Sequence, residues 1–128
     1  MGLEVRVADG LPELRADQVQ LQQVLLNLLV NAVDAMQGLS GRPRRIVVEV
    51  RADPACGVLF AVEDSGPGVP AGQAAALFDA FYSTKTDGLG MGLAISKSII
   101  ENHGGSLWLD ASGPDGSRFA FCIPVAQP

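Results

Sequence analysis

Residues 23–32 read QVLLNLLVNA and lie at the centre of the longest helical pattern in the chain. Apolar residues recur at helical spacing from Gln18 to about Gln37, which predicts one helix with a core-facing side. Asp17 precedes the pattern as a predicted N-cap, with Gln20 three residues later as its capping-box partner. Glycine and proline follow Gln37 and end the helix. The predicted core-facing positions are Leu21, Leu25, Leu28, Leu29, Ala32 and Met36.

The same helix carries a polar stripe. Asn27, Asn31 and Asp34 lie at i, i+4 and i+7, so they share one side. By frequency, such a stripe is most often a solvated face. Asparagine is a poor helix former, however, and a solvent face would favour Glu, Lys or Arg. Carboxamide oxygens are hard, neutral ligands suited to Mg²⁺, so a metal site is the second interpretation.

Strands surround this helix on both sides. Alternating or continuous apolar runs predict strands over 3–7, 46–52, 58–63, 106–111 and 117–123, with turn residues between them. A short helix is expected at 73–80 and a second amphipathic helix at about 91–103, with Leu93, Ile95, Ile99 and Ile100 as its apolar positions. The order is mixed rather than a regular alternation of strand and helix. The sequence therefore predicts an α+β fold, a sandwich with helices on one face of a sheet.

Composition limits the classes of function. The 128 residues amount to a single domain, 1–128, with 48% hydrophobic residues. The net charge of -5 argues against general electrostatic binding to nucleic acid or to an anionic membrane surface. Cys56 and Cys122 lack the spacing of a zinc site. We interpret both as reduced thiols, with Cys122 buried in a core strand.

Two glycine loops are candidates for ligand binding. Residues 64–68, DSGPG, follow an apolar strand, where a carboxylate could accept a hydrogen bond from an amino group. An ordinary turn would have the same composition. Residues 88–92, GLGMG, open the second long helix, and free N–H groups at a helix start bind anions. The segment is neither a Walker A loop nor a dinucleotide-binding fingerprint. Lys85 lies just upstream and could reach a phosphate, although a solvated loop lysine explains it equally well.

These segments, in this order, resemble the catalytic domain of bacterial sensor histidine kinases. Residues 23–32 are similar to the N box, residues 64–68 to the first glycine box, and residues 88–92 to the second glycine box. LFDAF at 77–81 with STK at 83–85 resembles the F box, and GSRF at 116–119 the third glycine box. The short, TK-containing lid is similar to that of oxygen- and nitrogen-sensing kinases. The wider superfamily includes type II topoisomerases, heat-shock chaperone ATPases and MutL.

The resemblance implies a Bergerat fold: a two-layer α/β sandwich in which a mixed sheet is covered on one face by helices, with ATP under a flexible lid. Asp64 would bind the adenine amino group and Ser117 would support adenine through water. Asn31, with Asn27, would hold Mg²⁺ on the triphosphate. The remaining nucleotide-binding residues implied are Gly66, Gly68, Lys85, Gly88, Leu89, Gly90, Met91 and Gly92.

The resemblance also implies a mechanism. The domain would transfer the γ-phosphoryl group of ATP to a histidine on a separate dimerisation domain, with Asn27, Asn31 and Lys85 as catalytic residues. ATP-hydrolysing relatives carry a glutamate one turn before the magnesium-binding asparagine; Asn27 stands there and cannot act as a base. Many members have a lysine where this chain has Asp34, and Lys85 could replace it.

Two alternatives stay open. One is an ATPase or serine-directed kinase on the same fold, and the other is a nucleotide-sensing or docking module without transfer. The histidine-bearing hairpin is expected to be absent from the chain, and His103 is interpreted as structural. We expect a cytoplasmic domain that contacts neither nucleic acid nor a membrane, in a parent protein that could be membrane-anchored. Its direct partner would be the dimerisation domain, and a response regulator would be an indirect one.

Overall fold

A computed structural model of the chain describes residues 2–14, 16–37, 41, 43–69, 78 and 92–125. Their elements are, in order, β1 (Gly2–Val7), α1 (Gln18–Ala35), β2 (Arg45–Asp53), β3 (Gly57–Asp64), α2 (Gly92–Asn102), β4 (Ser106–Gly113) and β5 (Gly116–Ile123). All five predicted strands and both long helices are confirmed to within two residues of their expected ends. The predicted short helix at 73–80, the STK segment at 83–85 and the second glycine box at 88–92 fall outside the described residues, apart from Phe78 and Gly92.

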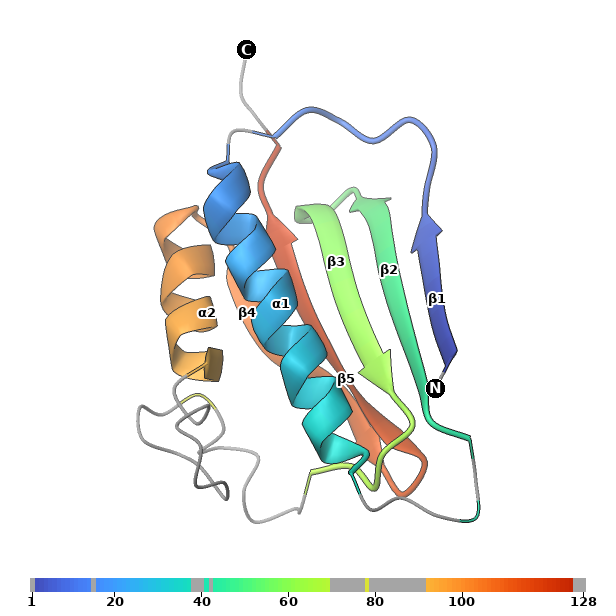
Figure 1. The fold of residues 1–128 in the computed structure, drawn as a ribbon. Coiled ribbons are helices and arrows are strands. Elements are labelled where there is room, and N and C mark those ends of the chain that lie inside the picture. Colours follow the sequence, from blue (N-terminus) through green and yellow to red (C-terminus); the bar gives the residue numbers. More distant parts are fainter. Residues whose placement is uncertain are drawn as a thin grey trace.

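The strands form one mixed sheet in the order β1-β2-β3-β5-β4. β1 pairs with β2 in parallel, and the other neighbours are antiparallel. Both helices lie on the same face of the sheet, side by side (Figure 1). This arrangement confirms the predicted two-layer α/β sandwich.

The core lies between the helices and the sheet. Its largest fully buried side chains include Phe121, Leu28, Met36 and Ile100. On α1 the buried residues are Val24, Leu28 and Ala32, while three of the predicted core positions are partly buried around them: Leu21, Leu25 and Leu29.

On α2 one of the four apolar positions does not face the core. Ile95 is 46% exposed, and Ser96 beside it is fully buried. Leu93, Ser96 and Ile100 follow the i, i+3, i+7 spacing of a helix face, so α2 turns a hydroxyl rather than an isoleucine toward the core.

Helix α1 begins at the predicted cap, but the capping box is only half formed. Asp17 Oδ1 accepts a hydrogen bond from the Gln20 backbone N–H at 3.1 Å. In a complete capping box, the Gln20 side chain would accept a hydrogen bond from the backbone N–H of Asp17. That N–H instead donates to His103 Nε2 at 3.0 Å. His103 therefore joins the end of α2 to the start of α1.

The two cysteines correct an expectation. Cys56 and Cys122 form a disulfide with a Cα–Cα distance of 6.1 Å, so they are not the reduced thiols inferred from sequence. β3 and β5 are neighbours, and Cys122 is paired with Leu59, three residues beyond Cys56. This register brings the two thiols together across 66 residues of sequence. Cys122 is 2% exposed, which confirms its predicted burial.

Neither helix in the described part of the chain combines the length and the hydropathy that a membrane span requires.

Candidate functional site

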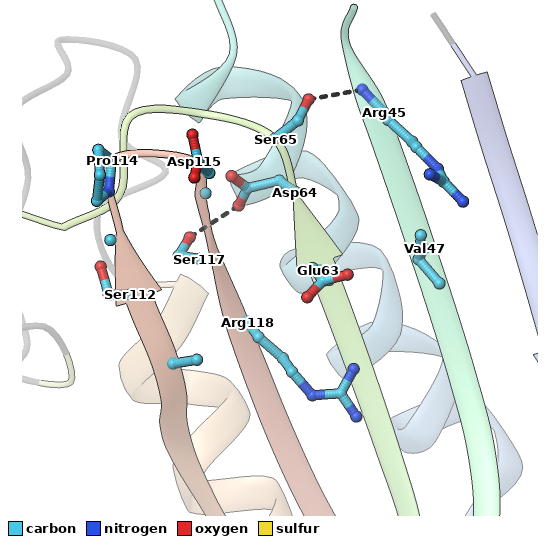
Figure 2. A pocket seen from close by; sticks show the side chains of 13 residues that line it. Arg45, Val47, Glu63, Asp64, Ser65, Ser112, Pro114, Asp115, Ser117 and Arg118 are labelled. Carbon is cyan, nitrogen blue, oxygen red and sulfur yellow. Dashed lines mark hydrogen bonds between the residues drawn. The ribbon is translucent and has the colours of Figure 1, made fainter.

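Asp64 is a buried carboxylate at the last position of β3, only 4% exposed. One oxygen, Oδ1, accepts a hydrogen bond from the Gly66 backbone N–H at 2.8 Å, and Oδ2 accepts one from the Ser117 hydroxyl at 2.9 Å. Figure 2 shows the Asp64 and Ser117 side chains pointing toward one another from adjacent strands. Each oxygen keeps a lone pair, so the carboxylate is held in one orientation and can still accept from a ligand.

Glycines let the backbone close around this carboxylate. A Cβ on Gly66 would lie 2.9 Å from Asp64 Oδ1 and 3.0 Å from the carbonyl oxygen of Ala35 in the last turn of α1. A Cβ on Gly116 would lie only 1.9 Å from the Asp64 carbonyl oxygen. Gly68 has a φ of +82° and approaches the Gly113 carbonyl. The first and third glycine boxes therefore meet at Asp64, next to the end of α1.

A hollow of about 440 Å³ opens beside this carboxylate (Figure 2). It is lined by Asp64, Ser117 and the β4–β5 turn, and it continues over the sheet face opposite the helices, past Glu63 and Arg118. Neither Asn27 nor Asn31 lines it. The hollow thus reaches Asp64 from the sheet face opposite the helices and does not extend to the predicted metal end.

Arg118 lines the hollow but is already neutralised. Its guanidinium contacts Glu49 at 2.6 Å and Asp110 at 3.2 Å. Burial disfavours the charge, yet hydrogen bonding and charge attraction from these two carboxylates raise the pKa of Arg118 above its usual value. A cation with two carboxylate partners is a poor candidate to bind a phosphate.

Asn27 faces α2, and both the nitrogen and the oxygen of its carboxamide are hydrogen-bonded. Nδ2 donates to the Gly92 carbonyl oxygen at 3.2 Å and to Ser96 Oγ at 3.0 Å. Its Oδ1 accepts from Gln23 Nε2 at 2.9 Å. The structure therefore brings together two predicted site residues, Asn27 and Gly92, through a direct hydrogen bond.

Asn31 differs from Asn27 in its partners. It is partly buried one turn farther along α1, and its side chain makes no hydrogen bond within the described residues. Its carboxamide oxygen is consequently better placed than that of Asn27 to bind a metal ion. No cluster of three or more His, Cys, Asp or Glu side chains suited to a metal occurs in the described part of the chain. A cation here would depend on neutral oxygens and on the ligand's own phosphates, as Mg²⁺ commonly does.

The remaining predicted phosphate-binding residues cannot be placed. Lys85, Gly88, Leu89, Gly90 and Met91 lie outside the described residues. Their roles stay predictions.

Sequence reasoning missed two residues near the site. Ser96 has a detectable signal, because it is a hydroxyl at a buried position of an apolar helix face. Gly116 belongs to the third glycine box, but the sequence assigns no role to it. Its contact with the Asp64 backbone depends on the β3–β5 register, in which Asp64 is paired with Ser117, and a single sequence does not reveal that register.

Comparisons with known proteins agree with this architecture. Residues 16–127 match the family model described as histidine kinase-, DNA gyrase B-, and HSP90-like ATPase. The sensor histidine kinase TmoS of Ectopseudomonas mendocina is 39% identical over 127 residues, which covers 98% of this chain and 13% of TmoS. The sensor protein FixL of Bradyrhizobium diazoefficiens is 42% identical over 114 residues, covering 88% of this chain and 22% of FixL. The chain thus spans less than a quarter of either relative.

Solved structures give the same result. The catalytic domain of histidine kinase ThkA, in a nucleotide-free form, is similar with a TM-score of 0.80 and 32% identity, covering 96% of this chain and 78% of that one. Full-length ShkA in complex with AMPPNP has a TM-score of 0.79 and 33% identity, covering 98% of this chain and 26% of ShkA.

Proposed function

Because this chain belongs to the family of histidine kinase-, DNA gyrase B- and HSP90-like ATPases, as an ATP-binding catalytic domain of the sensor histidine kinase type, we propose that it binds Mg-ATP between Asp64 and the polar side of α1 and passes the γ-phosphoryl group to a histidine on a separate dimerisation domain. The observation that carries this proposal is the buried Asp64 carboxylate, fixed by Gly66 and Ser117 next to the end of α1.

Asp64 would recognise the adenine amino group. A buried carboxylate with no cation among its hydrogen-bond partners in the described residues gains most from a donor that the ligand brings. Ser117 orients Oδ2, and Gly66 and Gly68 let the backbone pack closely around the carboxylate. Adenine satisfies this site because its exocyclic amino group is a donor.

Mg²⁺ would be held by Asn31, whose side-chain oxygen has no hydrogen-bond partner within the described residues. When bound, the ion neutralises charge on the β- and γ-phosphates. Asn27 would contribute a ligand only through the second lone pair of Oδ1, because the first accepts from Gln23. We therefore assign the main metal role to Asn31 and a supporting role to Asn27. Lys85 and residues 88–92 would complete the phosphate end.

The acceptor histidine must come from elsewhere. His103 is the single histidine of the chain. Its Nδ1 lies 2.8 Å from the Ile99 carbonyl oxygen and its Nε2 accepts from the Asp17 backbone N–H, so both ring nitrogens are engaged. It also follows the far end of α2, an 11-residue helix that begins at Gly92 and is about 16 Å long. His103 is thus structural and remote from the phosphate end.

Transfer to histidine is favoured over hydrolysis. The position at which an ATP-hydrolysing relative would carry a water-activating glutamate holds Asn27, whose two donor hydrogens are both used on α2. An amide cannot accept a proton from water. Phosphoryl transfer needs positioning and charge neutralisation more than a base, and a histidine nitrogen is a better nucleophile than water.

The test combines this chain with a histidine-bearing dimerisation domain and ATP labelled at the γ-phosphate. We expect acid-labile label on the histidine domain that depends on Mg²⁺ and is lost in the Asp64→Asn variant. Acid-stable label would instead indicate a serine-directed kinase, and steady phosphate release without protein label an ATPase. If neither protein label nor phosphate release is observed, a docking module remains as the explanation and the proposal is contradicted.

In the cell, we place this domain on the cytoplasmic side as part of a longer sensor kinase that signals through a response regulator. The family and the length of the relatives support this placement. The Cys56–Cys122 disulfide is unusual for that compartment, where thiols are kept reduced, so the response of the chain to reductant bears on this placement.

A further inference from the structure

Ser96 is a buried hydroxyl that the proposed mechanism does not use. It is 0% exposed on α2, one turn after Gly92, at a position whose helical neighbours Leu93 and Ile100 belong to the core. A buried hydroxyl persists when it has a hydrogen-bond partner. Here the partner is Asn27 Nδ2 at 3.0 Å, on the neighbouring helix.

The partners of Asn27 settle the orientation of its carboxamide. The Gly92 carbonyl oxygen can only accept a hydrogen bond, so the amide nitrogen of Asn27 must face α2. The carbonyl oxygen Oδ1, which alone could contact a cation, then faces away from α2 toward Gln23. Ser96 and Gly92 together receive both hydrogens of the amide, and this fixes the direction of the oxygen.

We propose that Ser96 is a positioning residue for the phosphate end of the ATP site, acting through Asn27. It holds the Asn27 amide against the first turn of α2, and so fixes where that turn begins relative to the polar side of α1. Residues 88–91, the proposed phosphate-binding loop, directly precede α2 in the sequence. The hydrogen bonds from Asn27 to Gly92 and Ser96 therefore fix the position of the helix start that follows this loop. The inference rests on the proposed function and names a residue that acts at the same site.

The test compares Ser96→Ala with Ser98→Ala, an equivalent change at an exposed position of the same helix. Affinities for Mg-ATP and for adenosine, which has no phosphate, are measured by NMR titration of the full chain. Removal of one buried hydrogen-bond partner should weaken Mg-ATP binding about five- to tenfold. Adenosine binding should be unchanged in both variants, because the Asp64 end has separate contacts. Ser98→Ala should behave as wild type.

A double-mutant cycle with Asn27→Ala distinguishes positioning from stability. If Ser96 acts through Asn27, Ser96→Ala should cause no further loss of Mg-ATP affinity once Asn27 is replaced. Ser96→Cys, which nearly preserves side-chain size but is a weaker partner, should give an intermediate loss. Thermal unfolding of each variant confirms that the compared proteins are folded.

Three results would overturn the inference: Mg-ATP affinity unchanged in Ser96→Ala, equal losses for Mg-ATP and adenosine, or additive effects of the two substitutions. Each differs from failure of the proposed function, in which the wild-type chain itself would not bind Mg-ATP.

Discussion

The Ser117 hydroxyl donates a 2.9 Å hydrogen bond to Asp64 Oδ2, and the two residues are direct partners in the β3–β5 pair. The first and third glycine boxes, more than 50 positions apart, therefore form one local structure. The sheet register places a hydroxyl donor beside the only buried carboxylate of the described residues. This is how strand pairing, rather than sequence proximity, builds the adenine end.

Asp64→Asn tests this end directly. The amide can keep the fold by accepting from Gly66 and donating to Ser117, but it then loses one of the two acceptor oxygens and the negative charge offered to adenine. A charged buried hydrogen bond contributes roughly 1.5–3 kcal/mol, so ATP affinity should fall at least about tenfold. Calorimetric titration measures it, and Glu101→Gln, at an exposed position outside the hollow, is the matched control. Equal ATP affinities of Asp64→Asn and wild type would show that Asp64 is not part of the ATP-binding site.

Gly116→Ala should destabilise the fold. Its φ of +145° is rarely adopted by other residues, and the new Cβ would lie 1.9 Å from the Asp64 carbonyl oxygen. We expect a loss of about 2 kcal/mol or more in the free energy of unfolding. Gly113→Ala, on the same hairpin with nothing within 4 Å of its Cβ, should change stability by less than about 0.5 kcal/mol. Urea unfolding compares them, and similar losses in the two variants would argue against the described turn.

His103→Ala should loosen the contact between the two helices. The substitution leaves the Asp17 N–H without its partner at the N-cap of α1 and removes the contact with the Ile99 carbonyl. A loss of about 1–2 kcal/mol in stability is expected. Asn102→Ala, exposed and adjacent, is the control. Because His103 is not the acceptor, ATP-dependent labelling of a dimerisation domain should persist in the folded variant. Loss of labelling from a stable His103→Ala protein would contradict a structural role.

Reduction of the disulfide should lower stability. Cys56 and Cys122 are 66 residues apart, and closing a loop of this length stabilises the native state by up to about 4 kcal/mol in the chain-entropy treatment. A reductant should therefore shift the urea midpoint of wild type downward and leave Cys56→Ser unaffected. If the two proteins respond identically to reductant, or if free thiols are detected in the wild-type chain without reductant, the cross-link does not form in solution.

Much of the fold follows from local sequence patterns. Helix α1 was predicted because apolar spacing, the Asp17 cap and the terminal glycines all indicate the same element. The strands follow from their apolar runs and the turn residues between them. Ile95 and Ser96 show the limit of periodicity: a hydroxyl is buried on α2 because Asn27 on another helix satisfies it, and no pattern within α2 contains that information.

Long-range pairings were not accessible. The Cys56–Cys122 disulfide, the contact of Gly116 with Asp64 and the contact of His103 with Asp17 all depend on which elements become neighbours. Motifs indicate which residues form the site, whereas the structure adds that Asn27 is engaged with α2 and that Asn31 has no such partner within the described residues. On that difference we propose Asn31 as the main metal ligand and Asn27 as a supporting one.

The most direct test of the account is a nucleotide titration of wild type and Asn31→Ala, with and without Mg²⁺. We predict saturable ATP binding that Mg²⁺ strengthens in wild type, and a substitution that weakens Mg-ATP binding while leaving metal-free ATP binding nearly unchanged. The central claim would be contradicted if the wild-type chain showed no saturable binding of ATP under either condition. An equal loss of affinity for Mg-ATP and for metal-free ATP in Asn31→Ala would contradict a metal-binding role of Asn31.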